Sequence, residues 1–274
     1  MSAAPAGSRA GWAEIPPAPA WWRVLPSRVL TFWVIELWRI AHDRTEIYTR
    51  AIQPALWLLV FGETFNRLRV IPTGHVGYLD YMAPGIIAQS GLFVAIFYGI
   101  HIIWERDAGM LSKLLATPTP RVALVSGKAF AAGLRAAAQA VIVFALGAIL
   151  RVHLDWNPLH LAAAVAIVMV GSAFFSTLSM AIAGVVLSRD RLMGIGQAFT
   201  MPLFFASNAL YPVYLMPGWL QVLSTVNPLS YEVDALRGLL IGTPDNLGLD
   251  CAVLAVALVA GIVVSSKLLP RLGR

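Results

Sequence analysis

The chain has 274 residues, of which 58% are hydrophobic and 12% are charged. Soluble domains carry about 25% charged residues, so water alone is not the expected solvent of this protein. The formal net charge is +6, but the basic residues are scattered between apolar stretches, which argues against a nucleic-acid partner. A single cysteine, Cys251, excludes an intramolecular disulfide and a cysteine-based metal site.

The amino-terminal part of the sequence predicts a tail followed by a surface helix. Residues 1–27 are rich in proline and glycine and have no apolar core of signal-peptide length, so we expect a disordered cytoplasmic tail. In residues 28–46, apolar side chains recur at helical spacing at Val29, Trp33, Leu37 and Ile40. Charged side chains recur on the opposite face at Glu36, Arg39, Asp43 and Glu46. This pattern predicts an amphipathic helix lying flat in the membrane interface, and a seventh buried helix is the alternative.

Residues 47–274 are expected to form one transmembrane domain, which makes the fold class an all-α membrane protein. A bilayer core about 30 Å thick requires about 20 mostly apolar residues in a helix. Six stretches meet this requirement: residues 51–69, 81–104, 122–150, 159–187, 192–211 and 249–269. The first stretch is the weakest, because Glu63 lies inside it and Pro54 removes a backbone donor near its start.

The distribution of lysine and arginine predicts the orientation, because cytoplasmic loops carry an excess of both. With the amino terminus inside, most of the 20 basic residues lie on the inner side. Those on the outer side are Arg67, Arg69, Arg151 and Arg237, and Arg135 lies within the third stretch. We therefore expect both termini in the cytoplasm.

The connection between the last two stretches, residues 212–248, is too long for a tight turn and too interrupted for another span. Residues 217–226 are apolar, and Asn227-Pro228 is typical of an N-cap followed by a helix-starting proline. The pattern predicts two short helices, the second ending at about Ile241. We expect both to be re-entrant helices in the outer leaflet.

The connection between the second and third stretches has the sequence ERDAGMLSKLLATPTPR, residues 105–121. It predicts a short amphipathic helix with Leu111, Leu114 and Leu115 on one side, ended by Thr117-Pro118. Two interpretations stay open from these residues. The leucine side either enters a groove on a soluble partner, or it rests on lipid with no partner.

The sequence shows no catalytic constellation. The five histidines have neither HxxxH nor HExxH spacing. The segment VSGKA, residues 125–129, resembles the end of a phosphate-binding loop but lacks the earlier glycine and the following Ser or Thr. We therefore expect a chain that is not an enzyme and that binds neither ATP nor a metal itself.

The segment ERDAGMLSKLLATPTPR, followed by LVSGKAF, resembles the signature of the ABC-2 type exporter permeases, the family of daunorubicin-type drug exporters and nodulation lipo-oligosaccharide exporters. The resemblance runs in order from about Arg28 to Leu269. Its further motifs are Gln53-Pro54, Ala83-Pro84-Gly85, Leu134-Arg135 with Gln139, and NPLSYEVDALRGLL at residues 227–240. Met110 and Ser112 depart from the pattern, because the family usually has Thr and Glu there.

The resemblance implies the transmembrane permease subunit of an ATP-binding-cassette exporter that moves a drug, lipid or lipid-linked glycan out of the cytoplasm. Residues 105–121 would be its coupling helix, which seats on a separately encoded ATPase subunit that binds ATP and Mg. The residues assigned to this docking role are Glu105, Arg106, Gly109, Leu111, Leu114 and Leu115. The implied assembly contains two ATPase copies and a second permease, identical or homologous, in the plasma (inner) membrane of a prokaryote.

Polar side chains inside the spans need a reason, because a central charge costs about 2.5 to 3.5 kcal/mol on insertion scales. One face of the third stretch carries Lys128, Arg135 and Gln139. These side chains could face the substrate route or the ATPase side. The alternative is that the long side chains extend to the inner headgroups. In the fifth stretch, one face either lines a route between two permease copies or bonds to neighbouring helices. The candidate route residues are Arg135, Gln139, Gln197, Thr200, Asn208 and Tyr211.

Three carboxylates are candidates for polar contacts with a substrate on the outer side, namely Glu63, Glu232 and Asp234. The alternative is that they are solvated or locally paired. Two other functions remain, a membrane-embedded lipid-modifying enzyme and an ion-driven secondary transporter. The enzyme would need converging polar residues at bilayer depth, where only Glu63 and Arg135 are charged, and the transporter would need inverted repeats, which the sequence does not convincingly show.

Overall fold

A computed structural model describes residues 30–31, 33–38, 42, 44–68, 71–73, 76–116, 120–243 and 246–272. The expected tail, residues 1–27, lies outside the described residues, as do Val29, Arg39, Ile40 and Asp43 of the expected interfacial helix. The described part of the chain is helical throughout its regular structure and contains no strand. The expectation of an all-α protein is confirmed for this part.

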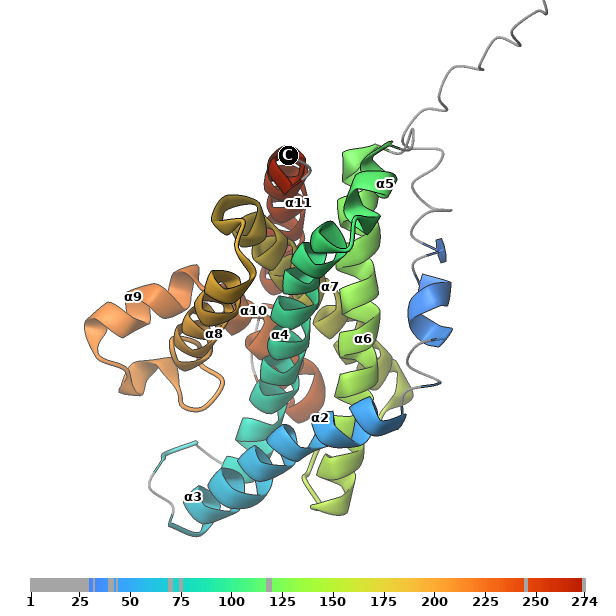
Figure 1. The fold of residues 1–274 in the computed structure, drawn as a ribbon. Helices are drawn as coiled ribbons and strands as arrows, with labels where there is room; N and C mark the ends of the chain where they lie inside the picture. Colours follow the sequence, from blue (N-terminus) through green and yellow to red (C-terminus); the bar gives the residue numbers. More distant parts are fainter. Residues whose placement is uncertain are drawn as a thin grey trace, which may run out of the picture.

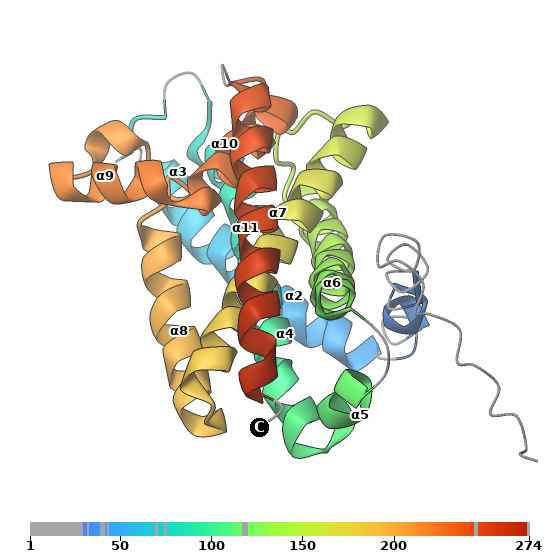
Figure 2. The ribbon, with the colours of Figure 1, turned by 90° about the horizontal axis from the view of Figure 1, so that it is seen from above.

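Among the described residues, four helices are long and apolar enough to cross a membrane. They are α4 (Tyr78–Asp107), α6 (Arg121–Ile149), α7 (Pro158–Val186) and α11 (Leu247–Leu272), and they match the second, third, fourth and sixth apolar stretches. Helix α7 packs against the other three (Figures 1 and 2). Their backbones approach closely, because a Cβ atom at Gly133 of α6 would lie 2.7 Å from the carbonyl oxygen of Met169 in α7.

The first apolar stretch belongs to a continuous helical run made of α2 (Arg44–Leu56), the π-helical segment η1 (Trp57–Gly62) and α3 (Glu63–Leu68). It crosses in front of α4 and α6 in Figure 1. Pro54 has no N–H group, so the carbonyl of Arg50 lacks the donor that the helix would otherwise provide. The side chain of Gln139 replaces that donor, with 3.2 Å between Gln139 Nε2 and Arg50 O. This bond attaches α2 to α6.

Helix α8 (Arg189–Phe205) ends earlier than the fifth apolar stretch predicts. The chain turns after Phe205 because Arg237 of α10 (Pro228–Ile241) binds the carbonyl oxygens that the turn exposes. The distances from Arg237 Nη2 are 2.7 Å to Asn208 O and 3.2 Å to Ala209 O. Asn208 and Tyr211 therefore lie outside the helix, and the expectation of one span over residues 192–211 is wrong for residues 206–211.

The connection from α8 to α11 contains a 3-10 turn, η2 (Val213–Leu215), followed by α9 (Gly218–Val226) and α10. Asn227 caps α10 as predicted, because its side-chain oxygen accepts from the N–H of Leu229 at 3.1 Å, and Pro228 is the first helical residue. The helix ends at Ile241, also as predicted. Helix α10 packs against α4, α7 and α11, whereas α9 extends away from the bundle (Figure 2).

Candidate functional site

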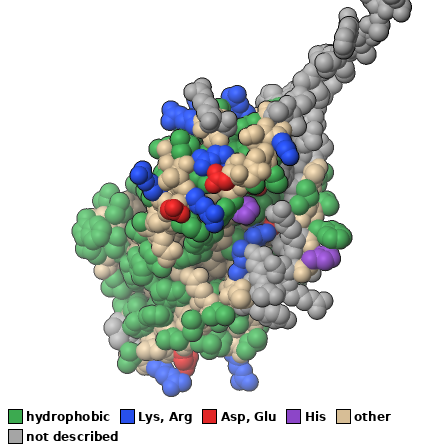
Figure 3. Space-filling view, viewed as in Figure 1, with side chains coloured by type: hydrophobic (Ala, Val, Ile, Leu, Met, Phe, Trp, Pro, Cys, Tyr) green, Lys and Arg blue, Asp and Glu red, His purple; other side chains and the backbone are tan. Residues whose placement is uncertain are grey.

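The first candidate site is the segment where α4 ends and α5 (Met110–Ala116) begins. Gly109 joins the two helices with a φ of +70°, a left-handed conformation that glycine adopts without strain. We call residues 105–116 the coupling segment. Lysine and arginine side chains gather over the end of the molecule that carries α5, whereas hydrophobic side chains cover the middle of the same face (Figure 3).

The leucines of the coupling segment face the bundle. Leu111 is fully buried, and Leu114 and Leu115 are partly buried against the hydrophobic core. Leu111 therefore cannot enter a groove on a partner in this arrangement, whereas Leu114 and Leu115 are only partly buried and their docking role stays a prediction. The side chains exposed to a partner are those of Asp107, Ala108, Met110, Ser112 and Lys113.

Glu105 and Arg106 also act within the chain, although the resemblance places both in the docking surface. Glu105 forms an ion pair with Lys128 of α6, and both side chains are largely buried. Arg106 donates to the carbonyl oxygen of Leu187, at the end of α7, at 2.9 Å. Lys128 is therefore paired inside the chain instead of being exposed. These two contacts fasten the carboxyl-terminal end of α4 to α6 and α7.

The second candidate site surrounds Arg135, at the middle of α6. Arg135 forms an ion pair with Glu36 and lies over the ring of Tyr98, 5.2 Å from its centroid. Glu36 is 1% exposed and also accepts from the Tyr98 hydroxyl at 3.2 Å. The expectation that Glu36 belongs to a water-facing charged face is wrong, because a cation inside a helix bundle requires a counter-charge nearby. Apolar side chains of this segment are exposed instead, at Leu30, Val34, Ile35, Leu37 and Trp38.

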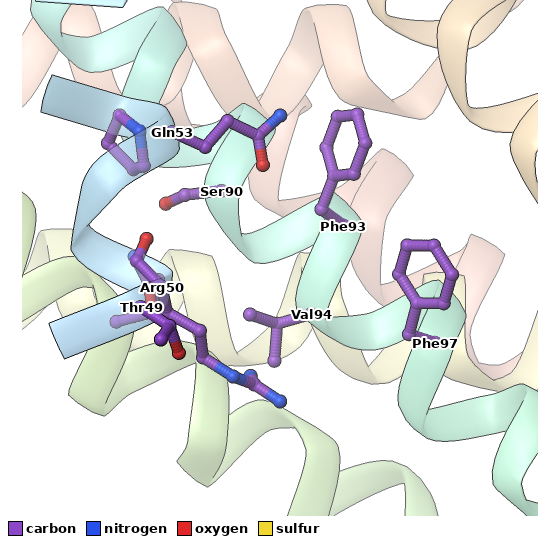
Figure 4. A pocket seen from close by; sticks show the side chains of 9 residues that line it. Thr49, Arg50, Gln53, Ser90, Phe93, Val94 and Phe97 are labelled. Atoms are coloured by element: carbon purple, nitrogen blue, oxygen red, sulfur yellow. The ribbon is translucent and has the colours of Figure 1, made fainter. Parts of the chain in front are cut away.

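Two adjoining cavities lie beside Arg135, and both are lined by Arg50 and Phe97. One has a volume of about 280 Å³ and extends over Thr49, Gln53, Pro54, Ser90, Phe93, Val94 and Gln139. The other has a volume of about 180 Å³ and extends over Tyr98, His101 and Arg135. We call the two together the α2–α4 cavity. Figure 4 shows its first part, with the side chains of α2 on one side and those of α4 on the other.

The polar residues of the fifth apolar stretch do not form the single face that the sequence predicts. Gln197 is exposed, whereas Thr200 is buried and donates back to the carbonyl oxygen of Gly196 at 2.6 Å. Asn208 is buried in the turn after α8 and donates to Asp234 at 2.5 Å. The Tyr211 hydroxyl donates to Phe205 O at 2.7 Å. Three of the four side chains therefore make hydrogen bonds inside the chain.

The three candidate carboxylates of the outer side have different environments. Glu63 pairs with Arg67 at 2.9 Å, as the alternative of local pairing predicts. Asp234 accepts from Asn208 and lies 3.8 Å from Arg237. Glu232 is fully buried against α7, where its carboxylate would touch a Cβ atom at Gly171. Glu232 therefore cannot contact a substrate at the outer surface, and that expectation is wrong.

Arg237 is a buried structural cation, although its position in the sequence suggests an outer-side residue. Its side chain is stacked on Tyr81, 3.6 Å from the ring centroid, and it donates to three backbone carbonyls. Burial lowers the pKa of Arg237 from its usual value. Within the described residues, no group of three or more His, Cys, Asp or Glu side chains could hold a metal ion.

Comparison with known proteins agrees with the motifs around these sites. The sequence profile of the ABC-2 type transporter matches residues 27–241. The chain belongs to this family. It is 31% identical over 203 residues to a protein of Porphyra purpurea that carries the name transport permease ycf38, a match that covers 71% of this chain and 67% of the relative. The match to the corresponding protein of Cyanophora paradoxa covers 64% of that relative.

Two further relatives of this ABC-2 type protein carry names that refer to drug resistance and nodulation. The daunorubicin resistance ABC transporter permease protein DrrB1 of Streptomyces coeruleorubidus is 26% identical, over 76% of this chain and 74% of the relative. Nodulation protein J of Rhizobium leguminosarum bv. viciae is 27% identical, over 72% of this chain and 76% of the relative. With four apolar helices in its described part, the chain is a multi-pass membrane protein.

The sequence did not predict that Arg50, Phe97 and His101 line a cavity in this ABC-2 protein. Arg50 precedes the Gln53-Pro54 motif by one turn, and Phe97 follows Phe93 at helical spacing, so both positions carried a signal. Which helix packs against that face is not encoded in the spacing. The cavity brings together Arg135 and Gln139 of the predicted route, but not Gln197, Thr200, Asn208 or Tyr211.

Proposed function

We propose that this chain is the permease subunit of an ATP-binding-cassette exporter and that a separately encoded subunit binds and hydrolyses ATP with Mg. The observation that carries the proposal is the family match together with the coupling segment, which presents an exposed polar side while its leucines are packed inside. Two ATPase copies and a second permease, identical or homologous, complete the transporter. The substrate is a drug, lipid or lipid-linked glycan, moved out of the cytoplasm.

The docking surface consists of the exposed side chains from Asp107 to Lys113, instead of the six residues that the resemblance assigns. Gly109 sets the angle at which α5 leaves α4. Glu105, Arg106 and the leucines transmit force, because they fasten the coupling segment to α6 and α7. ATP-driven movement of the docked subunits shifts these helices together and changes the packing between two permeases.

The proposed topology has six spans with both termini in the cytoplasm of a prokaryotic cell, in its plasma membrane. The run Arg44–Leu68 and α8 are the two spans beyond the four apolar helices. Exposed apolar side chains on both support contact with lipid, including Ile52, Leu56, Leu59, Val60, Met193, Phe199 and Phe205. Residues 28–46 lie in the inner interface, residues 47–274 form the transmembrane domain, and α9 and α10 enter the outer leaflet.

Of the six candidate route residues, we assign to the substrate route those that line the cavity or are exposed. Arg135 and Gln139 line the α2–α4 cavity, and Gln197 is exposed on α8. Thr200, Asn208 and Tyr211 are assigned to the structure of the chain, because their hydrogen bonds are made internally. Asp234 stays an outer-side contact, since its side chain is 44% exposed.

Co-purification with an ATPase tests this function. The chain is co-expressed with candidate ABC ATPases and purified in mild detergent through a tag on the chain. We expect one ATPase to co-purify, and Lys113→Glu with Met110→Asp to reduce its yield several-fold. Lys267→Glu, a charge reversal at an exposed position of α11, is the matched control and should leave the yield unchanged. If no ATPase co-purifies with the wild-type chain, the proposal is rejected.

A further inference from the structure

The α2–α4 cavity has the dimensions of a small-ligand site. Its two parts have volumes of about 280 and 180 Å³ and are both lined by Arg50 and Phe97. Pockets for small molecules have volumes of about 300 to 1,000 Å³, so a single-chain amphiphile would occupy both parts of this space. Phe97 is 40% exposed, and Thr49, Gln53 and His101 are also exposed, so the cavity opens to the side of the bundle.

One wall of the cavity is apolar. Phe93, Val94 and Phe97 lie on the same side of α4, and in Figure 4 they face Gln53 and Arg50 of α2. Burial of an alkyl chain against these side chains is favourable by about 0.8 kcal/mol for each methylene group. The apolar wall therefore supplies affinity for a hydrocarbon or aromatic portion of a ligand.

The opposite end of the cavity is cationic. Arg50, Arg135 and His101 line it, and Glu36 is the carboxylate that meets Arg135. A guanidinium group has several N–H donors in a planar fork and can bind more than one acceptor at a time. Arginine binds carboxylates and phosphates in preference to neutral groups because the hydrogen bonds are charge-assisted.

A buried polar atom beside this end also lacks a partner. Gln139 is 3% exposed and donates through Nε2 to Arg50 O, which orients its amide. Its Oε1 atom has no hydrogen-bond partner in the part of the chain that the structure describes. A buried acceptor without a donor is costly, and a hydroxyl or N–H group of a bound molecule would satisfy it.

We propose that the α2–α4 cavity binds an anionic amphiphile. Its carboxylate or phosphate lies among Arg50, Arg135 and His101, its apolar portion lies along Phe93, Val94 and Phe97, and a hydroxyl or N–H group donates to Gln139 Oε1. This binding requires no ATPase and extends the proposed function. Only the further step, in which the amphiphile is itself the exported molecule, rests on that function.

A pair of matched probes tests the proposal on the purified chain in detergent. The first probe is 11-(dansylamino)undecanoate, and the second is its methyl ester, which has the same tail and no charge. Dansyl fluorescence measures binding. We expect the acid to bind about tenfold more tightly than the ester, since the ester cannot form charge-assisted hydrogen bonds. Equal affinity of the two probes would overturn the proposal.

Variants locate the site. Arg50→Gln should weaken acid binding about tenfold and leave the weak ester binding unchanged, so retained ester binding shows that the variant is folded. Phe97→Ala should weaken both probes. Phe199→Ala, at an exposed position of α8, is the control and should change neither. Acid binding that is unaffected by both Arg50→Gln and Phe97→Ala would place the probe elsewhere and reject the site.

Displacement distinguishes the source of the ligand. Phosphatidylglycerol that displaces the acid probe, while phosphatidylcholine does not, identifies a resident anionic lipid. Displacement by decanoate but by neither phospholipid identifies a single-chain anionic amphiphile. Displacement by phosphatidylcholine as effectively as by phosphatidylglycerol contradicts anion recognition. None of these measurements involves the ATPase, so their failure leaves the co-purification result standing.

Discussion

Gln139 and Pro54 are linked through one backbone carbonyl. Proline at position 54 cannot donate to Arg50 O, and Gln139 Nε2 donates to that oxygen instead at 3.2 Å. Both residues belong to the motifs that resemble the ABC-2 family, although they are 85 positions apart. The structure explains why the two residues occur together. The proline leaves the carbonyl oxygen of Arg50 without its helical donor, and the glutamine side chain provides a donor instead.

This link predicts a coupling between the two positions. Gln139→Leu should lower the free energy of unfolding by about 1 to 3 kcal/mol, because Arg50 O then loses the side-chain donor that replaces the N–H group missing at Pro54. Thermal unfolding in detergent measures the loss.

The double variant is the control. In Pro54→Ala, the N–H of residue 54 can bond to Arg50 O within α2, so Gln139→Leu should cost less in that background. Equal costs of Gln139→Leu in the two backgrounds would show that the glutamine does not compensate for the proline.

The ion pair between Arg135 and Glu36 predicts a second coupling. Arg135→Gln or Glu36→Gln alone leaves a buried charge without its counter-charge and should cost about 3 to 5 kcal/mol. The double variant Arg135→Gln with Glu36→Gln should be more stable than either single variant. Additive losses, measured by thermal unfolding, would mean that the pair contributes little.

Much of the fold could be predicted because its signals are local. Four apolar stretches are found as α4, α6, α7 and α11, since the length required to cross a bilayer is written in consecutive residues. The start of α10 at Pro228 and its end at Ile241 follow from an N-cap, a proline and the glycine at position 242. Such patterns need no knowledge of neighbouring helices.

The direction of each side chain could not be predicted in the same way. The spacing of Leu111, Leu114 and Leu115 defines a side of α5, but whether that side meets the bundle or a partner depends on how α5 folds back onto the chain. Glu36 belongs to a charged stripe in sequence and contacts Arg135 only in the folded protein. The end of α8 depends on Arg237, which lies more than 30 residues later. These contacts are tertiary, and periodicity contains no information about them.

Gly109 predicts an effect on coupling that is separate from stability. Its φ of +70° disfavours other residues, but a Cβ atom there would meet nothing within 4 Å. Gly109→Ala should therefore cost only about 1 to 2 kcal/mol from backbone strain and should tilt α5, reducing the ATPase activity that the chain stimulates in its partner. Gly109→Asn is the control, since asparagine tolerates left-handed backbone better, and it should retain more stimulation than the alanine variant.

The contact between Gly171 and Glu232 predicts a clash that a second substitution relieves. A Cβ atom at position 171 would lie 2.2 Å from Glu232 Oε2, so Gly171→Ala requires the buried carboxylate of Glu232 to move. Overpacking of this kind costs about 1 to 3 kcal/mol, which thermal unfolding in detergent would detect.

Glu232→Ala should rescue this variant, because it removes the carboxylate that the new methyl group would meet. Glu232→Gln keeps the size of the side chain and should leave Gly171→Ala as unstable as before. It should also be tolerated in the wild-type background, because the fully buried carboxyl group of Glu232 has no hydrogen-bond partner among the described residues and an uncharged amide is less costly to bury there. Rescue by glutamine as complete as that by alanine would show that the charge of Glu232, and not its size, conflicts with the added methyl group.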